Sequence, residues 1–252
     1  MSQPFFIVLY NKRILVTLSS LMLTLLTLVL FIHIIDIQKI PLSAPLPLEG
    51  KVVAIDAGHG GIDTGTHYAH KLLEKDLNLE IALKLQKALV GNGAKVIMTR
   101  ETDISLDHQA KTPYRHREDL NARVYIINKN TSDLFVSIHG NYVTNSPSTL
   151  GPIVFYYGKS EKSNLLASHI QDSLNTLSAY RKVGAKAKHT ARRGDFVLLR
   201  ETAPPGVLVE TGFFSNAVDR TLLQKESHQE EMAQLIIQGI IQYFTDPLHT
   251  TN

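Results

Sequence analysis

The chain has 252 residues, with 26 lysines and arginines against 23 aspartates and glutamates, no cysteine, and a formal net charge of +3. The absence of cysteine excludes disulfide frameworks, thiolate metal sites and cysteine nucleophiles, so any metal must be held by histidine and carboxylate ligands. The small net charge and the scattered basic residues argue against a nucleic-acid partner.

The first element of the chain is a long apolar segment. Lys12 and Arg13 precede it, and no charged residue follows until Asp36. A helix over this stretch would be roughly 33 Å long, enough to cross a hydrocarbon core of about 30 Å. We therefore predict a cytoplasmic N-terminus over 1–13 and a transmembrane anchor over 14–36, with the rest of the chain on the cell-wall side. A cleaved signal peptide is the alternative, although no small-residue cleavage pattern follows the segment.

After the anchor we predict a stiff proline-rich linker over 37–50, one folded domain over 51–246 and a tail over 247–252. Within the domain, short apolar runs alternate with longer amphipathic segments. The predicted strands cover 52–55, 95–98, 134–138, 153–156 and 207–209, and the predicted helices cover 74–90, 114–128, 163–177 and 230–244. This alternation predicts an α/β fold, with a twisted, mostly parallel sheet flanked by helices on both faces.

Three of the predicted strands end at residues that carry metal-binding or acid–base chemistry. His59 lies just past the first strand, and His139 and Glu210 directly follow two later strands. In open α/β sheets, ligands bind at the edge formed by the carboxyl ends of the strands. Glu74 begins the first long helix, and the loop that enters this helix returns from His59. We therefore expect all four side chains to converge on one site.

Two imidazoles and one carboxylate form the ligand set typical of catalytic zinc, which leaves a fourth position to water. The predicted zinc ligands are His59, Glu74 and His139. Glu210 is then a spare carboxylate beside the metal, which suits a general base. Each residue alone also has an ordinary structural explanation, such as a glycine-rich turn for His59 or a helix start for Glu74. The combination is what points to a site.

Other residues and motifs give no competing site. The chain has no G-x-S-x-G elbow, no H-E-x-x-H helix and no glycine loop with a Walker lysine. The remaining histidines of the domain lie in polar loops or on helix faces, and we interpret them as solvated: His67, His70, His108, His116, His169, His189, His228 and His249.

At these residues the sequence resembles the zinc-dependent N-acetylmuramoyl-L-alanine amidases of the amidase 3 family. The matching segments are VVAIDAGHGGIDTG, LLEKDLNLEIALKLQKAL, VIMTRETD, DLFVSIHGN and VLVETGFFSN. The resemblance implies zinc on His59, Glu74 and His139, and Glu210 as the catalytic carboxylate. It also implies hydrolysis of the amide between the muramic acid lactyl group and L-alanine in peptidoglycan. Asn141, close to the second histidine, is a candidate substrate-binding residue.

The segments KLLEKDLNLE and YRHREDLNARVYIIN are particularly similar to the germination-specific members of that family. This similarity implies a role in spore cortex maturation, in which stems are removed so that muramic-δ-lactam can form. The segment 188–206 departs most from the family pattern, so substrate contacts are not predicted there. A zinc peptidase acting within the stem peptide and a non-catalytic wall-binding regulator remain alternatives. The sequence also leaves open a possible activating protein partner.

Overall fold

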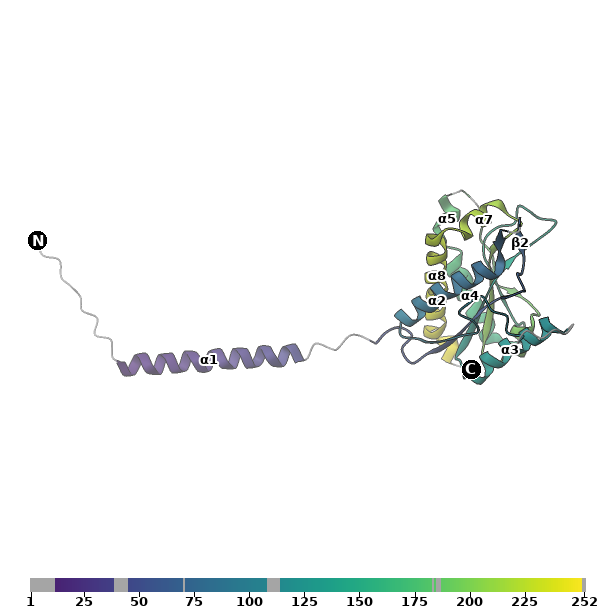
Figure 1. The fold of residues 1–252 in the computed structure, drawn as a ribbon. Helices are drawn as coiled ribbons and strands as arrows, with labels where there is room; N and C mark the ends of the chain where they lie inside the picture. Colours follow the sequence, from purple (N-terminus) through teal and green to yellow (C-terminus); the bar gives the residue numbers. More distant parts are fainter. Residues whose placement is uncertain are drawn as a thin grey trace, which may run out of the picture. The chain divides into compact units, whose positions relative to one another are not determined.

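The computed structural model describes residues 12–38, 45–69, 71–107, 114–182, 184 and 187–250. The chain divides between Pro45 and Leu46 into two units, the first with the helix α1 and the second with the sheet (Figure 1). Most of the predicted cytoplasmic N-terminus, part of the predicted linker and the last two residues of the predicted tail lie outside the described residues.

The first unit contains one apolar helix, α1 (Lys12–Gln38). Its stretch Arg13–Ile32 has a mean hydropathy of 2.5, and the side chains of this stretch are exposed. The hydroxyls of Thr17, Thr24 and Thr27 donate hydrogen bonds to backbone carbonyls three or four residues earlier. The polar groups on this apolar helix therefore have partners within the helix itself. By length and composition this helix is able to span a membrane, and a signal sequence near the N-terminus would have the same properties.

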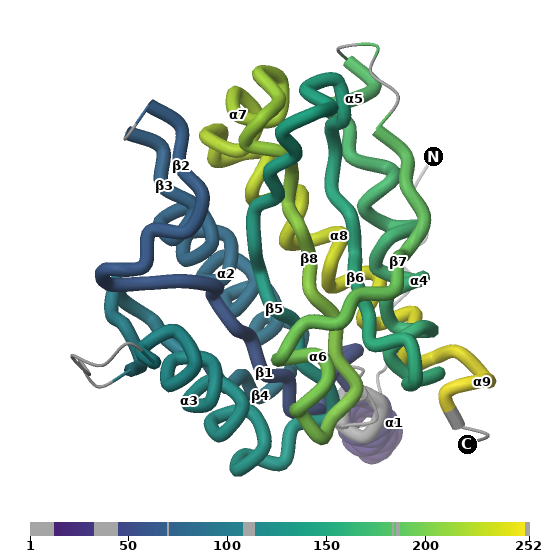
Figure 2. The backbone as a smooth tube through the Cα atoms, turned by 90° about the vertical axis from the view of Figure 1, so that its right-hand side faces the viewer, coloured from purple at the N-terminus to yellow at the C-terminus, as the bar shows by residue number. Residues whose placement is uncertain are grey.

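The second unit is built on a six-stranded sheet with the order β4-β1-β5-β8-β6-β7 (Figure 2). The strands β4, β1, β5 and β8 run parallel, β6 runs antiparallel to β8, and β7 runs parallel to β6. The predicted α/β fold with a mostly parallel sheet is therefore confirmed. The bounds of the strands are β1 Val52–Ala57, β4 Lys95–Met98, β5 Leu134–Asn141, β6 Ile153–Tyr156, β7 Arg192–Arg193 and β8 Gly206–Phe213.

Helices cover both faces of this sheet, as predicted. The helices α2 (Glu74–Gly91), α4 (Glu161–Leu174) and α8 (Glu226–Thr245) pack in the larger core on one face. On the other face, α3 (Arg115–Lys129) and α6 (Val197–Glu201) enclose a smaller core (Figure 2). We call these the α2/α8 face and the α3/α6 face.

Strand residues alternate between the two faces because successive side chains of a strand point in opposite directions. In β1, Val53 and Ile55 are buried in the core of the α2/α8 face, whereas Ala54 is buried in the core of the α3/α6 face. In β8, Val207 is likewise buried in the core of the α2/α8 face and Leu208 in the core of the α3/α6 face. Burial on both faces explains why these strands read as continuous apolar runs in the sequence.

The observed start of one long helix differs from the predicted start because of an N-terminal cap. Helix α4 begins at Glu161, two residues before the predicted start, because the Ser160 hydroxyl accepts a hydrogen bond from the Ser163 N–H at 3.1 Å. Several short elements were not predicted, since they hold too few residues for a periodic pattern. They are β2 His67–Tyr68, β3 Leu72–Leu73, α5 Ser178–Lys182, α7 Ala217–Leu223 and α9 Pro247–Thr250, together with β7 and α6.

Candidate metal centre and active site

The α3/α6 face of the sheet becomes polar towards the carboxyl ends of β1, β5 and β8. In the strand register, Asp56 of β1 pairs with Ser137 of β5. His139, two residues after Ser137 on β5, pairs with Glu210 of β8. Side chains of paired residues lie on the same face, so His139 and Glu210 are direct neighbours. His59 follows β1 after Gly58. The structure thus places His59, His139 and Glu210 at one edge of the sheet, as the sequence predicted.

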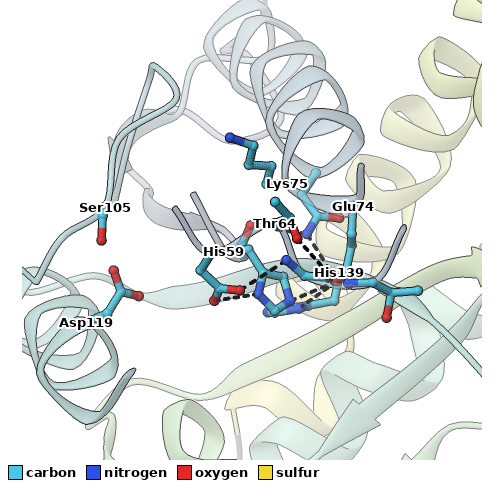
Figure 3. A network of polar contacts seen from close by, with 12 residues as sticks. His59, Thr64, Glu74, Lys75, Ser105, Asp119 and His139 are labelled. Carbon is cyan, nitrogen blue, oxygen red and sulfur yellow. Dashed lines mark hydrogen bonds and ion pairs between the residues drawn. The ribbon is translucent and has the colours of Figure 1, made fainter. Parts of the chain in front are cut away.

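His59, Glu74 and His139 form a cluster of side chains that could hold a metal ion (Figure 3). Each offers one ligand atom, and these atoms lie within 4.8 Å of one another. Glu74 Oε1 is 3.1 Å from His59 Nε2 and 3.2 Å from His139 Nδ1. Two imidazole nitrogens and one carboxylate oxygen, in a chain without thiolates, match the donor set of catalytic zinc sites. The residues present therefore fit a divalent cation.

The Glu74 carboxylate is held in place from several sides. Its Oε2 accepts a hydrogen bond from the Thr66 N–H at 2.7 Å, and its Oε1 accepts one from the Gly140 N–H at 3.0 Å. The Asn78 side-chain amide lies 3.3 Å from the same Oε1. Such partners orient a metal ligand before the metal binds. Gly140 is also needed for space, because a Cβ there would lie 2.4 Å from the Phe214 ring.

His59 occupies a backbone conformation that non-glycine residues rarely adopt, with φ of +62°. Strain of this kind costs on the order of 1–3 kcal/mol and persists only where surrounding contacts impose it. The Nδ1 atom of His59 lies 2.8 Å from Asp63 Oδ2, so the other ring nitrogen faces Glu74. A carboxylate behind a histidine ligand sets the ring orientation and its basicity. The sequence reasoning did not identify Asp63, although it lies in the same glycine-rich segment.

Two buried arginines hold the strained turn. Arg123 donates to the carbonyls of Ala57 and His59, at 2.7 and 2.6 Å. Arg100 donates to the carbonyls of Ala57 and Gly58, at 2.8 and 3.0 Å. Both side chains are 2% exposed. The turn that carries His59 is therefore fixed by charged donors from α3 and from the segment after β4, a role that the sequence pattern alone did not reveal.

The charge of Arg123 is balanced by two carboxylates, Asp56 at 2.7 Å and Asp119 at 2.6 Å. Asp56 also accepts hydrogen bonds from the hydroxyls of Ser137 and Thr99. Burial opposes ionisation of Asp56, but the charges of Arg123 and His139 and the hydrogen bond from Ser137 outweigh it and lower the pKa of Asp56 to about 2. This network lies directly beneath the site and makes its floor rigid.

Glu210 differs from the other carboxylates of the site because its charge is not compensated by a bonded partner. Its Oε2 is shielded from solvent and has no hydrogen-bond partner among the described residues. Burial therefore raises the pKa of Glu210 to about 7, against the opposing effect of His139. Burial works against the charged form of His59 as well, but hydrogen bonds to Asp63 and Glu74 raise its pKa to about 10. The site thus combines a carboxyl group poised near neutral pH with imidazoles that face carboxylates.

A cavity of about 350 Å³ adjoins the cluster, and His59, His139 and Glu210 contribute to its lining. Its walls come from α3 and from the segment that leads into α6. A larger groove of about 800 Å³ lies between α2 and α8, but charged surface residues line it and none of the clustered groups does. The smaller cavity is therefore the one that belongs to the site.

Two further sequence interpretations have different outcomes. Asn141 ends β5, and its carbonyl accepts the Phe214 N–H at 2.7 Å, but it is not among the described residues that line the cavity. The interpretation of His228 as solvated is wrong, because it is 3% exposed on the inner side of α8. Two of the other histidines, His70 and His108, lie outside the described residues.

Comparison with known proteins identifies close relatives. The profile of the Amidase_3 family, described as N-acetylmuramoyl-L-alanine amidase, matches residues 53–242. The germination-specific N-acetylmuramoyl-L-alanine amidase of Bacillus subtilis is 40% identical over 203 residues, which cover 80% of this chain and 83% of that protein. The probable cell wall amidase LytH of Staphylococcus aureus is 30% identical over 203 residues, which cover 79% of this chain and 60% of LytH.

Solved structures agree with these matches. The CwlD amidase from Clostridioides difficile, determined in complex with the GerS lipoprotein, has a TM-score of 0.70 and 35% identity, covering 77% of this chain and 98% of that one. The N-acetylmuramoyl-L-alanine amidase AmiC2 of Nostoc punctiforme has a TM-score of 0.64 and 30% identity, covering 78% and 98%. The family match, the relatives and the clustered histidines and glutamate agree, and the chain belongs to the Amidase_3 family of N-acetylmuramoyl-L-alanine amidases.

Proposed function

We propose that the chain hydrolyses the amide between the muramic acid lactyl group and L-alanine with a zinc ion held by His59, Glu74 and His139, and with Glu210 as the catalytic carboxylate. The observation that carries this proposal is the position of Glu210, which pairs with His139 across neighbouring strands and has an unpartnered oxygen beside the three ligand groups. When bound, zinc would polarise the carbonyl under attack and lower the pKa of a water molecule.

The remaining chemistry falls to the side chains. Glu210 takes the proton of the attacking water and passes it to the leaving L-alanine amine. Burial raises the pKa of Glu210 above that of an exposed glutamate, and a more basic carboxylate is a better proton acceptor for this role. Asp63 orients the His59 ring through Nδ1, and the Thr66 and Gly140 N–H groups orient Glu74. Asn141, at the end of β5, is proposed to contact the substrate.

We further propose that the enzyme acts on the spore cortex, where removing stems prepares muramic acid for δ-lactam formation. The similarity to the germination-specific amidase of Bacillus subtilis supports this role. The test is cortex analysis in a spore-forming host that lacks the gene. We expect cortex without muramic-δ-lactam, restored by the wild-type chain but not by a Glu210→Gln chain. Normal lactam content in the deletion strain would contradict the proposal.

The apolar helix α1 is proposed to be a retained anchor that leaves the catalytic unit on the cell-wall side, because Lys12 and Arg13 precede it. A protein partner on the same side is also proposed, since the CwlD relative was determined in complex with the GerS lipoprotein. The size of the mature protein tests the anchor: a chain shortened beyond α1 would identify a cleaved signal instead.

The activity test is to incubate the full-length chain with peptidoglycan, with zinc or with a chelator, and to identify products by mass. We expect free stem peptides that begin with L-alanine, lost on chelation and restored by zinc. His139→Ala should abolish both product and stoichiometric zinc, whereas His169→Ala, at a half-buried histidine paired with Asp246, should change neither. Cleavage within the stem would favour the peptidase alternative. One zinc per chain in His139→Ala would contradict the ligand assignment.

A further inference from the structure

The positive charge of the chain is concentrated in the segment between Asp172 and Asp195. This segment contains six lysines and arginines and no acidic residue. The rest of the chain holds 20 of the 26 lysines and arginines and all 23 aspartates and glutamates, so its formal charge is −3. The basic residues are therefore less evenly scattered than the small net charge suggests. A local excess of one sign of charge favours contact with a partner of the opposite sign.

Part of this segment forms an outer edge of the sheet. Strand β7, made of Arg192 and Arg193, is the last strand in the sheet order, and Figure 2 shows it beside β6. Lys188, Arg192 and Arg193 are exposed, and within the described part of the chain their side chains have no hydrogen bond or ion pair. The next acidic residue along the chain, Asp195, is already paired with Arg200 at 2.6 Å. We call Lys188, Arg192 and Arg193 the cationic edge.

The backbone that carries the cationic edge is held in place. The His189 N–H donates to Asn175 Oδ1 at 2.9 Å, and the Asn175 side-chain amide donates to the His189 carbonyl at 2.8 Å. The Gly194 N–H donates to the Tyr156 carbonyl at 2.9 Å. Between these points β7 pairs with β6. The three cations therefore project from a fixed backbone, so less conformational entropy is lost when they bind a ligand.

Strand register connects the cationic edge to the cavity beside the metal cluster. One row of paired residues crosses the sheet on the α3/α6 face, and it consists of Asp56, Ser137, Leu208, Phe155 and Arg192. The first three of these line the cavity. Neighbouring strands lie about 4.8 Å apart, so the backbone of Arg192 is roughly 10 Å from that of Leu208. A polymer that occupies the cavity and extends towards β7 therefore meets Arg192.

We propose that the cationic edge binds carboxylates of peptidoglycan stems that lie outside the cleft, beside the stem being cut; this proposal rests on the amidase function proposed above. A peptidoglycan strand carries further stems on either side of the one under attack, and each stem that is not cross-linked ends in a free carboxylate. Guanidinium and ammonium groups form charge-assisted hydrogen bonds with carboxylates. One exposed ion pair contributes little, but three cations act together on a polymer that carries many carboxylates.

Protection of the sheet edge is the alternative explanation for these charges. Charged side chains on an edge strand prevent it from pairing with another chain. Charges of either sign fulfil that role, so it does not explain why the segment between Asp172 and Asp195 lacks acidic residues altogether. The two explanations also differ in what they require of a ligand, since edge protection does not depend on carboxylates in peptidoglycan.

Binding to peptidoglycan tests the proposal. The full-length chain, in detergent micelles and with a chelator present, is sedimented with insoluble peptidoglycan that has been freed of phosphate polymers. The second ligand is the same material after its carboxyl groups have been converted to amides. We expect this conversion to weaken binding of the parent chain by about tenfold. One variant with Lys188→Gln, Arg192→Gln and Arg193→Gln should bind both materials as weakly as the parent binds the amidated one.

Two further variants control for charge and folding. The matched control changes three exposed lysines on other elements, Lys87→Gln, Lys95→Gln and Lys225→Gln, and should behave like the parent although its net charge falls by the same amount. The conservative variant with Lys188→Arg, Arg192→Lys and Arg193→Lys should keep the preference for free carboxylates. Raising the salt concentration from about 50 to about 500 mM should weaken binding of the parent to unmodified peptidoglycan. Parent-like binding by the first variant, or an equal loss in the matched control, would overturn the proposal.

Failure of the proposed function gives a different result from failure of this inference. Stem release in the presence of zinc is measured separately, by mass. A chain that prefers peptidoglycan with free carboxylates through the cationic edge but releases no stems would retain the binding surface and lose the amidase assignment. A chain that releases stems, but whose neutralised edge binds peptidoglycan like the parent, would retain the function and overturn the binding surface.

Discussion

At the scale of single residues, the pairing of Glu210 with His139 shows how strand register brings two reactive side chains together. They occupy paired positions on β8 and β5, so the register alone brings a carboxyl group beside an imidazole. No described residue bonds to Glu210 Oε2, and burial raises the pKa of this group, whereas Asp56 on the same face has an arginine partner and a lowered pKa. Two carboxylates on one face therefore have different roles, set by their partners.

Glu210→Gln tests the proton-transfer role. The change keeps the size of the side chain but removes the proton acceptor, so we expect the rate on peptidoglycan to fall by about 10²–10⁴-fold. Metal content should remain at one per chain, because Glu210 is not among the clustered ligand groups. The control is Glu201→Gln, at an exposed carboxylate of α6 that pairs with Arg200, and it should keep full activity. A near-native rate for Glu210→Gln would remove Glu210 from proton transfer.

Gly58→Ala tests whether the histidine cluster needs its close packing. A Cβ at Gly58 would lie 2.3 Å from His139 Cε1, so the ring must move. We expect metal affinity to fall by about 10–100-fold, with only a small change in the melting temperature. Gly91→Ala is the matched control, since nothing lies within 4 Å of a Cβ at that position. Metal titration and thermal unfolding report the two effects, and unchanged affinity in Gly58→Ala would show that the ring tolerates displacement.

At the scale of elements, the short helices α5 and α7 are joined to α8 by a buried polar cluster. The Tyr180 hydroxyl on α5 donates to Asp219 on α7 at 3.0 Å, and Asp219 also accepts the N–H groups of Gly151 and Phe213. The ring of His228 on α8 packs edge-on against Tyr180, with centroids 5.7 Å apart. Neither nitrogen of that ring has a hydrogen-bond partner among the described residues. This histidine is therefore kept neutral.

The packing of His228 predicts acid sensitivity. Burial lowers its pKa to about 4, from the ordinary value of 6.5. Between pH 4 and pH 6.5, His228 therefore binds a proton in the unfolded chain but not in the folded chain. Stability therefore falls as pH decreases from 6.5 to 4, by about 3 kcal/mol over the whole window.

His228→Phe should remove this dependence, because the ring stays but no longer titrates. Urea unfolding of the variant should show a stability close to the parent at pH 7 and a higher stability than the parent at pH 4.5. His67→Gln, at an exposed histidine of β2, is the control and should keep the pH dependence of the parent. A variant that loses stability with acid as steeply as the parent would exclude His228 as the cause.

At the scale of the whole molecule, the catalytic unit includes residues that the sequence pattern assigned to the linker. The compact unit begins at Leu46, and Leu48 is fully buried, with its N–H donating to the Asn92 carbonyl at 2.9 Å. Within the predicted linker over 37–50, Leu48 therefore belongs to the core, whereas residues 46, 47, 49 and 50 are exposed. Composition alone did not show this, because a proline-rich stretch reads as extended chain whether or not one of its leucines is buried.

Leu48→Ala tests this boundary. We expect the free energy of unfolding to fall by about 2–4 kcal/mol, the usual cost of truncating a buried leucine. Leu46→Ala is the control, since that side chain is 50% exposed and should cost less than about 1 kcal/mol. Denaturant unfolding of the catalytic unit measures both, and equal effects of the two changes would argue that Leu48 does not anchor the segment.

The parts of the fold and site that were predicted are those with a local or periodic signal. Buried apolar runs indicated the strands, and since parallel strands share a carboxyl edge, the ends of β1, β5 and β8 indicated where His59, His139 and Glu210 would meet. The supports were not predictable in this way. Arg123 bonds to Asp56, which lies 67 positions earlier in the sequence, and no local sequence pattern predicts such a contact.

By itself, the sequence determined the order of the longer strands and helices, the apolar N-terminal helix and the four chemical groups of the site, because side-chain periodicity and strand ends are local properties. Only the tertiary structure decided which of these groups have partners. The strained turn of His59, the Glu210 oxygen without a partner among the described residues and the cavity beside the metal cluster all depend on contacts between distant segments. Burial and countercharge, which set the chemistry of each carboxylate, exist only once the chain has folded.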